Sequence, residues 1–229
     1  MNIAIVQIYD DNIKEYAEYS RLMNAMYAHK HNYTYIAIEY DLVPVSMSVY
    51  YNKILAIMSA LKDSRKFEYV LYLDSDAIIT NFDYTIESII ERHLDKDIII
   101  ASDENGTNNG VLLFKNTAKS LEFLQRSFSN RSFFHTDTPE QNAMLFYLQN
   151  EYRKNTGLEK PSFFNAYLDG YKDQKGKSQV WNEQSFILHL MCLSTKDRCA
   201  VMREKLAKMG IVCIPKPADG PKAMPVKKI

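Results

Sequence analysis

The chain has 229 residues, with 28 Lys and Arg against 28 Asp and Glu, so its formal net charge is zero. This length suits one large domain with a sizeable core, and the balanced charge gives no support to a nucleic-acid partner or a membrane surface. No apolar run reaches the length of a membrane span, and the three cysteines lack a C-x-x-C spacing, which is typical of reduced thiols in a cytoplasmic protein.

Apolar runs that predict strands alternate along the chain with helical patterns, in which apolar residues recur every three or four positions. The strands are expected over residues 2–8, 33–40, 69–73, 97–101, 111–114, 186–191 and 211–214. The helices are expected over about 12–27, 49–61, 86–92, 116–128, from 138 onward and over 194–209. This alternation predicts an α/β domain whose central, mostly parallel mixed sheet is flanked by helices.

Three connecting segments carry polar residues of interest. The segment 103–110 is predicted as a polar turn, and its Asn-Gly pair is typical of a tight hairpin. The sequence T-P-E-Q at 138–141 has the pattern of a strong helix start. The Pro- and Lys-rich segment 215–229 is typical of a linker to a further domain, so the folded domain is expected to span 1–214.

The predicted strand over 69–73 ends abruptly in the sequence Asp74-Ser75-Asp76. Carboxylates beside a buried strand are tolerated when they are paired or hold a cation, because an isolated ion loses its hydration. Alternate residues of an extended segment point the same way, so the two acids can converge on one ion. Their oxygens favour Mn²⁺ or Mg²⁺. The alternative is that these acids only form a turn or cap a helix.

His189 lies in an otherwise apolar run and is a further candidate ligand. An imidazole beside two carboxylates suits Mn²⁺, whereas the alternative for a buried histidine is a hydrogen-bonded core residue. The helix that is predicted to start at Ser194 carries Lys196 and Arg198 close to its N-terminus. Backbone N–H groups and these two cations can hold phosphate oxygens there, and the alternative for both side chains is a solvated helix face.

Several motifs follow one another in the order of a known enzyme family. They are Y-x-N-K-I-x-A-I at 50–57, L-Y-L-D-S-D-A-I-I at 71–79, N-N-G-V-L-L-F-K-N at 108–116, E-Q-N-A at 140–143 and F-I-L-H-L at 186–190. This order resembles the metal-dependent GT-A glycosyltransferases. It is most similar to the galactosyl/mannosyltransferase type of family 34 and to the related glycosyltransferase domains of large algal viruses. The resemblance spans residues 2–214 and implies a single Rossmann-like GT-A domain.

The resemblance implies an enzyme that moves a hexose or deoxyhexose from a nucleotide-diphosphate sugar, usually a UDP-sugar, to a hydroxyl of a glycan or glycoprotein. For a viral protein it implies the host cytoplasm. The implied ligands of Mn²⁺ or Mg²⁺ are Asp74, Asp76 and His189. The residues implied to bind the donor are Gln7, Ile8, Tyr9, Lys53, Asp74, Ser75, Gly110, Lys196 and Arg198. The residues implied to shape the sugar and acceptor site, with catalytic roles, are Asp103, Asn109, Glu140 and Gln141.

Two positions depart from the family pattern and bear on these assignments. Tyr51 stands where many relatives carry Trp, and Cys192 stands where Gly often follows the histidine. The second departure bears on the roles of Lys196 and Arg198.

Other interpretations remain beside each assignment. Glu140 and Gln141 are also explained by the helix start alone, Lys53 by a side chain that extends from a core helix to solvent, and Asp103 by an ordinary turn. Tyr50, like Tyr16 and Tyr51, is expected in the core.

If the reaction inverts the anomeric centre, Asp103 or Glu140 is the candidate base. If it retains the configuration, the surroundings of Asn109 and Gln141 would stabilise an oxocarbenium-like sugar.

Two rival functions also stand. One is a haloacid-dehalogenase-like phosphatase, whose nucleophile motif is also D-x-D after an apolar strand. Against it, the motif here follows a later strand rather than the first. The other rival is a module that binds a nucleotide sugar without catalysis.

Overall fold

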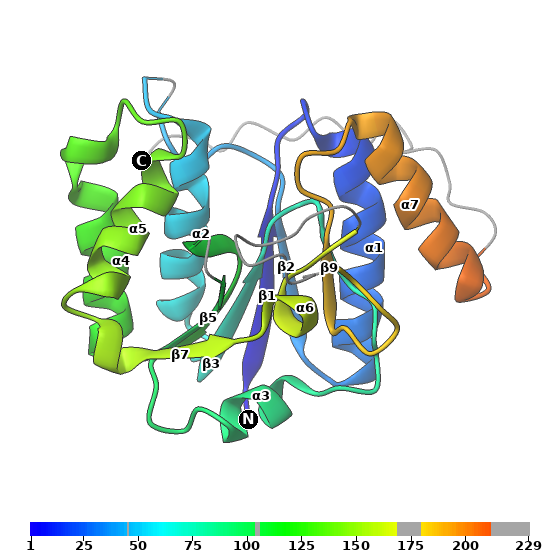
Figure 1. Cartoon of the computed structure of the whole chain (residues 1–229), viewed down its shortest axis with the longest axis horizontal. Coiled ribbons are helices and arrows are strands. Elements are labelled where there is room, and N and C mark those ends of the chain that lie inside the picture. Colours follow the sequence, from blue (N-terminus) through cyan, green and yellow to red (C-terminus); the bar gives the residue numbers. More distant parts are fainter. Residues whose placement is uncertain (45, 104–105, 169–179, 212–229) are drawn as a thin grey trace.

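The structure is a computed structural model that describes residues 1–44, 46–103, 106–168 and 180–211. Apart from Ile211, the predicted strand over 211–214 lies outside these residues, as does the predicted linker. The described chain forms an α/β domain in which helices cover both faces of a central sheet (Figure 1). This architecture confirms the predicted fold class.

The central sheet contains six strands in the order β2-β1-β3-β6-β5-β7. They are β1 (Ile3–Ile8), β2 (Thr34–Ile38), β3 (Tyr69–Leu73), β5 (Ile98–Asp103), β6 (Gly106–Lys115) and β7 (Thr156–Glu159). β1 pairs in parallel with β2 and β3, and β5 pairs in parallel with β7, whereas β6 is antiparallel to both of its neighbours. Within this sheet, every strand except β6 therefore points the same way. The carboxyl ends of β1 and β3 lie at the same edge of the sheet.

A second, smaller sheet was absent from the predicted elements. It contains β4 (Ala77–Ile79), β9 (Ile187–His189) and β8 (Ala166–Tyr167), in that spatial order. β4 comes directly after the D-x-D motif and pairs antiparallel with β9, with Ala77 opposite His189. This pairing places His189 beside Asp76, although 113 positions separate the two residues in the sequence.

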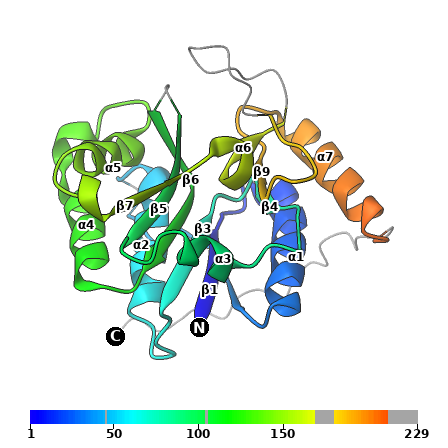
Figure 2. The same cartoon turned by 60° about the horizontal axis from the view of Figure 1, so that its bottom comes forward.

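The helices divide between the two faces of the central sheet. They are α1 (Lys14–Lys30), α2 (Asn52–Leu61), α3 (Ile86–Glu91), α4 (Ala118–Ser129), α5 (Pro139–Gln149), α6 (Pro161–Phe164) and α7 (Thr195–Lys208), with 3-10 turns η1 (Val49–Tyr51), η2 (Arg131–Phe133) and η3 (Arg153–Asn155). Helices α2, α4 and α5 cover one face, while α1, α3 and α6 lie on the other and α7 packs on α1 (Figures 1 and 2). Among the described helices, none is long and apolar enough to cross a membrane.

The strand β3 is apolar without interruption because both of its faces are buried. Val70 and Tyr72 pack into the core beneath α2 and α4, and Leu71 and Leu73 pack into the core on the other side of the sheet. A strand that is buried on both faces has no position that favours a polar side chain. Full burial of each leucine contributes about 1.5–3 kcal/mol, so β3 fixes the position of the acid that follows it.

Two local predictions are wrong. Asn109 and Gly110 lie inside β6 and not in a turn, because the pairing of β5 with β6 continues as far as Asp103 opposite Gly106. Tyr50, expected in the core, is 53% exposed, since the residues before α2 form the turn η1. The helix start at 138–141 is confirmed with proline as its first residue, although the threonine side chain makes no capping hydrogen bond.

Candidate functional site

The carboxyl ends of β1 and β3 border a cavity of about 490 Å³. The wall of this cavity is formed by the end of β1, the D-x-D motif, the start of α2 and one residue of α7. The predicted site residues that line it are Ile8, Tyr9, Lys53, Asp74, Ser75, Asp76 and Arg198. The exposed Tyr50 lines the same cavity, so this residue belongs to the surface of the site and not to the core.

Asp74 is the first residue after β3 and is held by two neighbours. Lys53 Nζ lies 3.0 Å from Asp74 Oδ1 and 3.2 Å from Oδ2, and the Tyr72 hydroxyl donates to Oδ1 at 3.0 Å. The side chain of Asp74 is still 27% exposed, so its carboxylate remains accessible from the cavity. The Ser75 hydroxyl donates to the carbonyl of Ile8 at 2.7 Å and thereby ties the motif to the end of β1.

Asp76 lies deeper and contacts two groups from the C-terminal part of the chain. Its Oδ1 is 3.1 Å from His189 Nε2, and its Oδ2 is 2.9 Å from Arg198 Nη2. Burial opposes ionisation of Asp76, but His189 and Arg198 outweigh burial and lower the pKa of the carboxyl group to about 2. Asp76 is therefore an anion at neutral pH.

One ligand atom from each of Asp74, Asp76 and His189 lies within 4.8 Å of the others. Two carboxylate oxygens and an imidazole nitrogen form a donor set that suits Mn²⁺, and the oxygens also suit Mg²⁺. The described residues thus fit a divalent cation at the positions that the sequence indicates.

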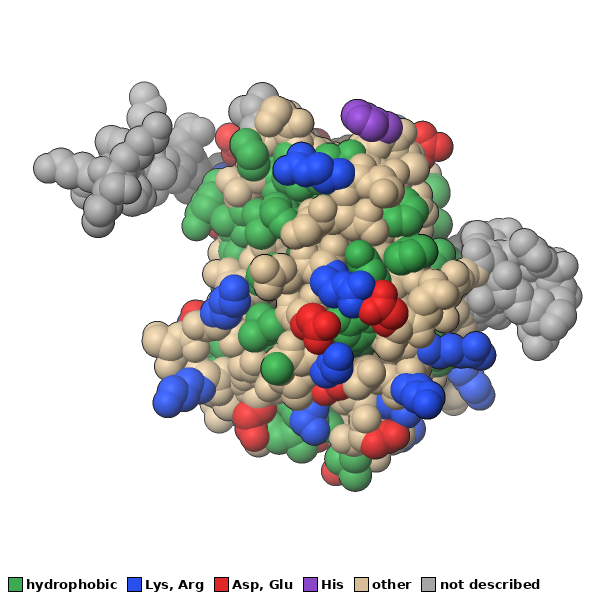
Figure 3. Space-filling model, turned by 90° about the vertical axis from the view of Figure 1, so that its left-hand side faces the viewer, with side chains coloured by type: hydrophobic (Ala, Val, Ile, Leu, Met, Phe, Trp, Pro, Cys, Tyr) green, Lys and Arg blue, Asp and Glu red, His purple; other side chains and the backbone are tan. Residues whose placement is uncertain are grey.

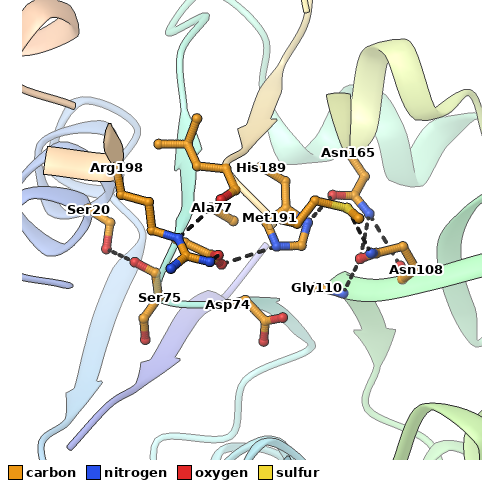
Figure 4. Close-up of polar contacts among 12 residues, drawn as sticks. Ser20, Asp74, Ser75, Ala77, Asn108, Gly110, Asn165, His189, Met191 and Arg198 are labelled. Atoms are coloured by element: carbon orange, nitrogen blue, oxygen red, sulfur yellow. Dashed lines mark hydrogen bonds and ion pairs between the residues drawn. The ribbon is translucent and has the colours of Figure 1, made fainter. Parts of the chain in front are cut away.

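The orientation of His189 depends on Asn165, a fully buried residue just after α6 that the sequence did not single out. The Asn165 side-chain amide donates to Oδ1 and to the backbone carbonyl of Asn108, at 3.1 and 3.3 Å. Its Oδ1 therefore faces His189 Nδ1, at 2.9 Å (Figure 4). An acceptor at this position requires the proton on Nδ1, which leaves the Nε2 lone pair of the neutral imidazole for a metal ion.

Gly110 and Asn108 in β6 complete this arrangement. The N–H of Gly110 donates to Asn108 Oδ1 at 2.9 Å, so the asparagine oxygen accepts from two sides and its orientation is fixed. A Cβ atom on residue 110 would lie 2.2 Å from His189 Cε1. Glycine is needed here because the imidazole approaches the β6 backbone closely.

Lys53 belongs to a buried polar cluster behind Asp74. Its ammonium group lies 3.0 Å from Asn109 Oδ1 and 3.5 Å from Glu140 Oε1, in addition to its contacts with Asp74. Burial by itself would lower the pKa of Lys53, but Asp74 and Glu140 raise it above its ordinary value. Because its side chain is only 7% exposed, Lys53 does not extend to solvent, and that alternative interpretation is wrong.

Glu140 and Gln141 both contact Asn109 from the start of α5. Asn109 Nδ2 donates to Glu140 Oε1 at 3.3 Å, and the Asn109 backbone N–H donates to Gln141 Oε1 at 3.3 Å. The second carboxylate oxygen of Glu140 is buried and has no hydrogen-bond partner among the described residues. Neither side chain lines the 490 Å³ cavity, and both lie behind Lys53 and Asn109.

Gln7 lies behind the cavity wall, and its predicted role at the nucleotide base stays a prediction. Its side chain is buried, with Nε2 donating to the carbonyl of Asp74 at 3.1 Å. Gln7 Oε1 accepts from Asn24 Nδ2 at 3.0 Å and from the Tyr35 hydroxyl at 2.5 Å. These bonds direct the side chain away from the cavity and use it to hold the backbone of the D-x-D motif.

Of the two cations predicted at the start of α7, only Arg198 lines the cavity, and Lys196 is exposed outside it. Helix α7 begins with Ser194 as its N-cap, whose hydroxyl accepts from the N–H of Asp197 at 3.2 Å. Asp103 is described by its backbone alone, at the end of β5. The site roles of Lys196 and Asp103 stay predictions.

A larger cavity, of about 590 Å³, lies between α3, β7 and α6, and none of the predicted site residues lines it. Two of its basic side chains contact one carboxylate, since Arg92 Nη2 and His93 Nε2 lie 2.8 and 3.0 Å from Glu159 Oε1. The chemistry of the D-x-D motif, and not cavity size, therefore locates the candidate site.

Solved structures with a similar fold are glycosyltransferases. One is a glycosyltransferase involved in the glycosylation of the major capsid of PBCV-1, with 18% identity, a TM-score of 0.74, and coverage of 89% of this chain and 100% of that chain. Another is GlyE of Streptococcus pneumoniae, with 15% identity, a TM-score of 0.56, and coverage of 92% and 64%. A third is mouse xyloside xylosyltransferase 1, with 11% identity, a TM-score of 0.54, and coverage of 84% and 98%. At these identities the likeness establishes the GT-A fold.

No curated protein sequence gives a significant match to the chain. The sequence model of the galactosyl transferase GMA12/MNN10 family, however, matches residues 9–96 and 90–200. These residues include the D-x-D motif, β6, His189 and Arg198, and this match overturns the phosphatase alternative. The chain therefore belongs to the galactosyl transferase GMA12/MNN10 family and is a glycosyltransferase.

Proposed function

We propose that this glycosyltransferase moves a hexose or deoxyhexose from a UDP-sugar to a hydroxyl group of a glycan or glycoprotein, with Mn²⁺ or Mg²⁺ as its metal. The observation that carries the proposal is the convergence of Asp74, Asp76 and His189 within 4.8 Å at the edge of a cavity. The relative involved in glycosylation of a viral major capsid supports a glycoprotein acceptor. A divalent cation bound there would supply positive charge to a diphosphate leaving group.

The protein's own residues would bind the donor along the cavity wall. Ile8 and Tyr9, with the exposed Tyr50, offer an apolar and aromatic surface for the nucleoside. Lys53 and Arg198 lie on either side of the D-x-D motif and would offset charge that develops on the phosphate oxygens. These positions give the two cations a role in binding and in leaving-group stabilisation.

The sugar end of the site would be shaped by Asn109 and Gly110 in β6, with Asp103 at the end of β5. Glu140 and Gln141 would act by holding Asn109 and Lys53 in place, since both contact Asn109 and lie outside the cavity lining. The buried ion pair with Lys53 disfavours Glu140 as a base on the acceptor. Asp103 then remains the candidate base if the anomeric centre is inverted.

A thermal-shift panel of UDP- and GDP-sugars with and without Mn²⁺ tests this function. At a ligand concentration about 100 times Kd, binding stabilises the native state by about 2.7 kcal/mol, which raises the Tm of a chain of this size by about 5–10 °C. We expect a metal-dependent shift with UDP-sugars. The substitution Asp76→Ala should abolish the shift, and Asp83→Ala, which removes an exposed acid paired with Lys30, should leave it intact.

The panel gives a clear negative result if no nucleotide sugar produces a metal-dependent shift. Release of UDP from the donor that binds best, measured with and without candidate glycan acceptors, then separates a transferase from a module that only binds. Slow hydrolysis of the donor, with faster turnover when an acceptor is present, is the expected outcome.

A further inference from the structure

The carboxylates of the D-x-D motif are in contact with polar and cationic side chains of the chain itself. Lys53 Nζ contacts both oxygens of Asp74, at 3.0 and 3.2 Å. His189 Nε2 contacts Asp76 Oδ1 at 3.1 Å, and Arg198 Nη2 contacts Asp76 Oδ2 at 2.9 Å. A cation that binds Asp76 must therefore compete with the guanidinium of Arg198 for the negative charge of one carboxylate, even when the cation contacts Oδ1 and the guanidinium contacts Oδ2.

The two internal cations differ in how firmly they are held. Lys53 is 7% exposed and is surrounded by the side chains of Asp74, Asn109 and Glu140. Arg198 is 18% exposed and lines the cavity. Its guanidinium lies 4.9 Å from the centre of the Tyr16 ring, and its Nε donates to the carbonyl of Leu190 at 3.1 Å. Arg198 is thus the more exposed of the two cations, whereas the side chain of Lys53 is enclosed by the buried polar cluster.

The charges around the D-x-D motif favour binding of an anion once a divalent cation is bound. With His189 neutral, the negative groups are Asp74, Asp76 and Glu140, and the positive groups are Lys53 and Arg198, which leaves one net negative charge. Addition of a divalent cation changes this to one net positive charge. It also weakens the attraction between Asp76 and the partly buried guanidinium, which favours pairing of Arg198 with another anion.

We propose that Arg198 couples metal binding to nucleotide binding, because it occupies Asp76 in the metal-free protein and pairs with diphosphate oxygens once a cation takes Asp76. This inference rests on the proposed function. Each ligand alone then binds weakly, and each raises the affinity for the other by the same factor. The bidentate geometry of guanidinium suits both partners, a carboxylate and a phosphate.

Isothermal titration of the whole chain tests the coupling with three probes: Mn²⁺ alone, UDP alone, and Mn²⁺ at saturating UDP. In the wild type we expect UDP to raise the Mn²⁺ affinity at least tenfold. In Arg198→Gln we expect Mn²⁺ alone to bind about three to ten times more tightly than in the wild type, because its competitor is gone. The enhancement by UDP should fall to threefold or less in this variant.

Arg203→Gln is a matched control on the same helix. Arg203 lies 6.0 Å from the ring centre of Tyr19, and its Nε donates to the carbonyl of Cys199, which repeats the surroundings of Arg198 without an acid of the D-x-D motif. The control should keep the wild-type coupling. Arg198→Lys retains a positive charge without the bidentate fork, and it should keep part of the coupling even if the glutamine variant folds poorly.

Two results would overturn the role of Arg198: a glutamine variant that keeps the wild-type enhancement, or one in which Mn²⁺ alone binds more weakly than in the wild type. Failure of the proposed function has a different signature. In that case the wild type itself binds no Mn²⁺ in the presence of UDP.

Discussion

His189 illustrates how single hydrogen bonds decide what a residue can do. Its Nδ1 faces Asn165 Oδ1, whose amide group is fixed in turn by Asn108. Gly110 makes room for the ring. A histidine held in this way presents Nε2 to Asp76 and to any cation there, and a different tautomer would present a proton. The ability of His189 to bind a metal ion therefore depends on Asn165, Asn108 and Gly110.

The substitution Asn165→Leu tests this arrangement at the level of one residue. It keeps a similar volume but removes the acceptor for Nδ1–H, so the imidazole loses its fixed orientation. Loss of such an outer partner lowers metal affinity by about 10–100-fold. Titration with Mn²⁺ should reveal this loss, and thermal unfolding without metal separates it from a general loss of stability.

Asn165→Asp serves as the comparison, because it retains the acceptor for His189 and loses the donor to Asn108. We expect its Mn²⁺ affinity to exceed that of the leucine variant. Equal Mn²⁺ affinity in the leucine variant and the wild type would mean that Asn165 only fills space.

The connection between β9 and α7 is the element that brings Arg198 to the cavity. It is short, and it turns through Cys192, which has a φ of 61° in the left-handed region. Glycine adopts this region without the steric cost that a Cβ atom introduces, so the glycine that the family resemblance implies would suit this position. Ser194 then starts α7 and sets the direction of the helix. Cys192 therefore carries a Cβ atom in a backbone region that favours glycine.

Cys192→Gly should stabilise the protein by about 0.5–1 kcal/mol, because relief of the left-handed strain exceeds the added flexibility of the unfolded chain. For a chain of this size the Tm should rise by about 1–4 °C. Cys192→Ser keeps a Cβ atom and should leave the Tm near the wild-type value. If the glycine variant melts at or below the serine variant, the strain at this position is negligible.

At the scale of the whole molecule, the site forms where two sheets meet. The central sheet supplies Asp74 at the end of β3, and the small sheet supplies His189 from β9, beside the start of β4. The face formed by α4 and α5 carries charges of both signs, interspersed with hydrophobic side chains (Figure 3). This mixture agrees with the balanced net charge.

The extent of the domain is a prediction that truncation can test. A chain that ends at residue 214 should keep its Tm within about 1–2 °C and its UDP and Mn²⁺ response, because the Pro- and Lys-rich composition of residues 215–229 is typical of a linker. A chain that ends at residue 193 should fail to fold stably, since it loses the buried Cys199, Met202 and Leu206 of α7. Loss of folding in the 1–214 chain would show that the segment 215–229 belongs to the domain.

The sequence by itself determined the elements whose signals are local. The run before Asp74 is apolar throughout because β3 is buried on both faces, and the acids after it were costly enough to indicate a cation. The alternation of strands and helices gave the fold class, and the order of motifs indicated His189 as the third ligand.

Only the tertiary structure decided which residues support these ligands. Asn165 has no local pattern that marks it, and its role arises from contacts with β6 and β9 that span 57 and 24 positions. The side chains of Gln7 and Lys53 are buried in hydrogen-bonded clusters. Pairing between distant strands determines on which side of the cavity wall each side chain lies, and the sequence does not show this. The register of β4 against β9 places Asp76 beside His189, and such long-range pairing leaves no periodic signal in the sequence.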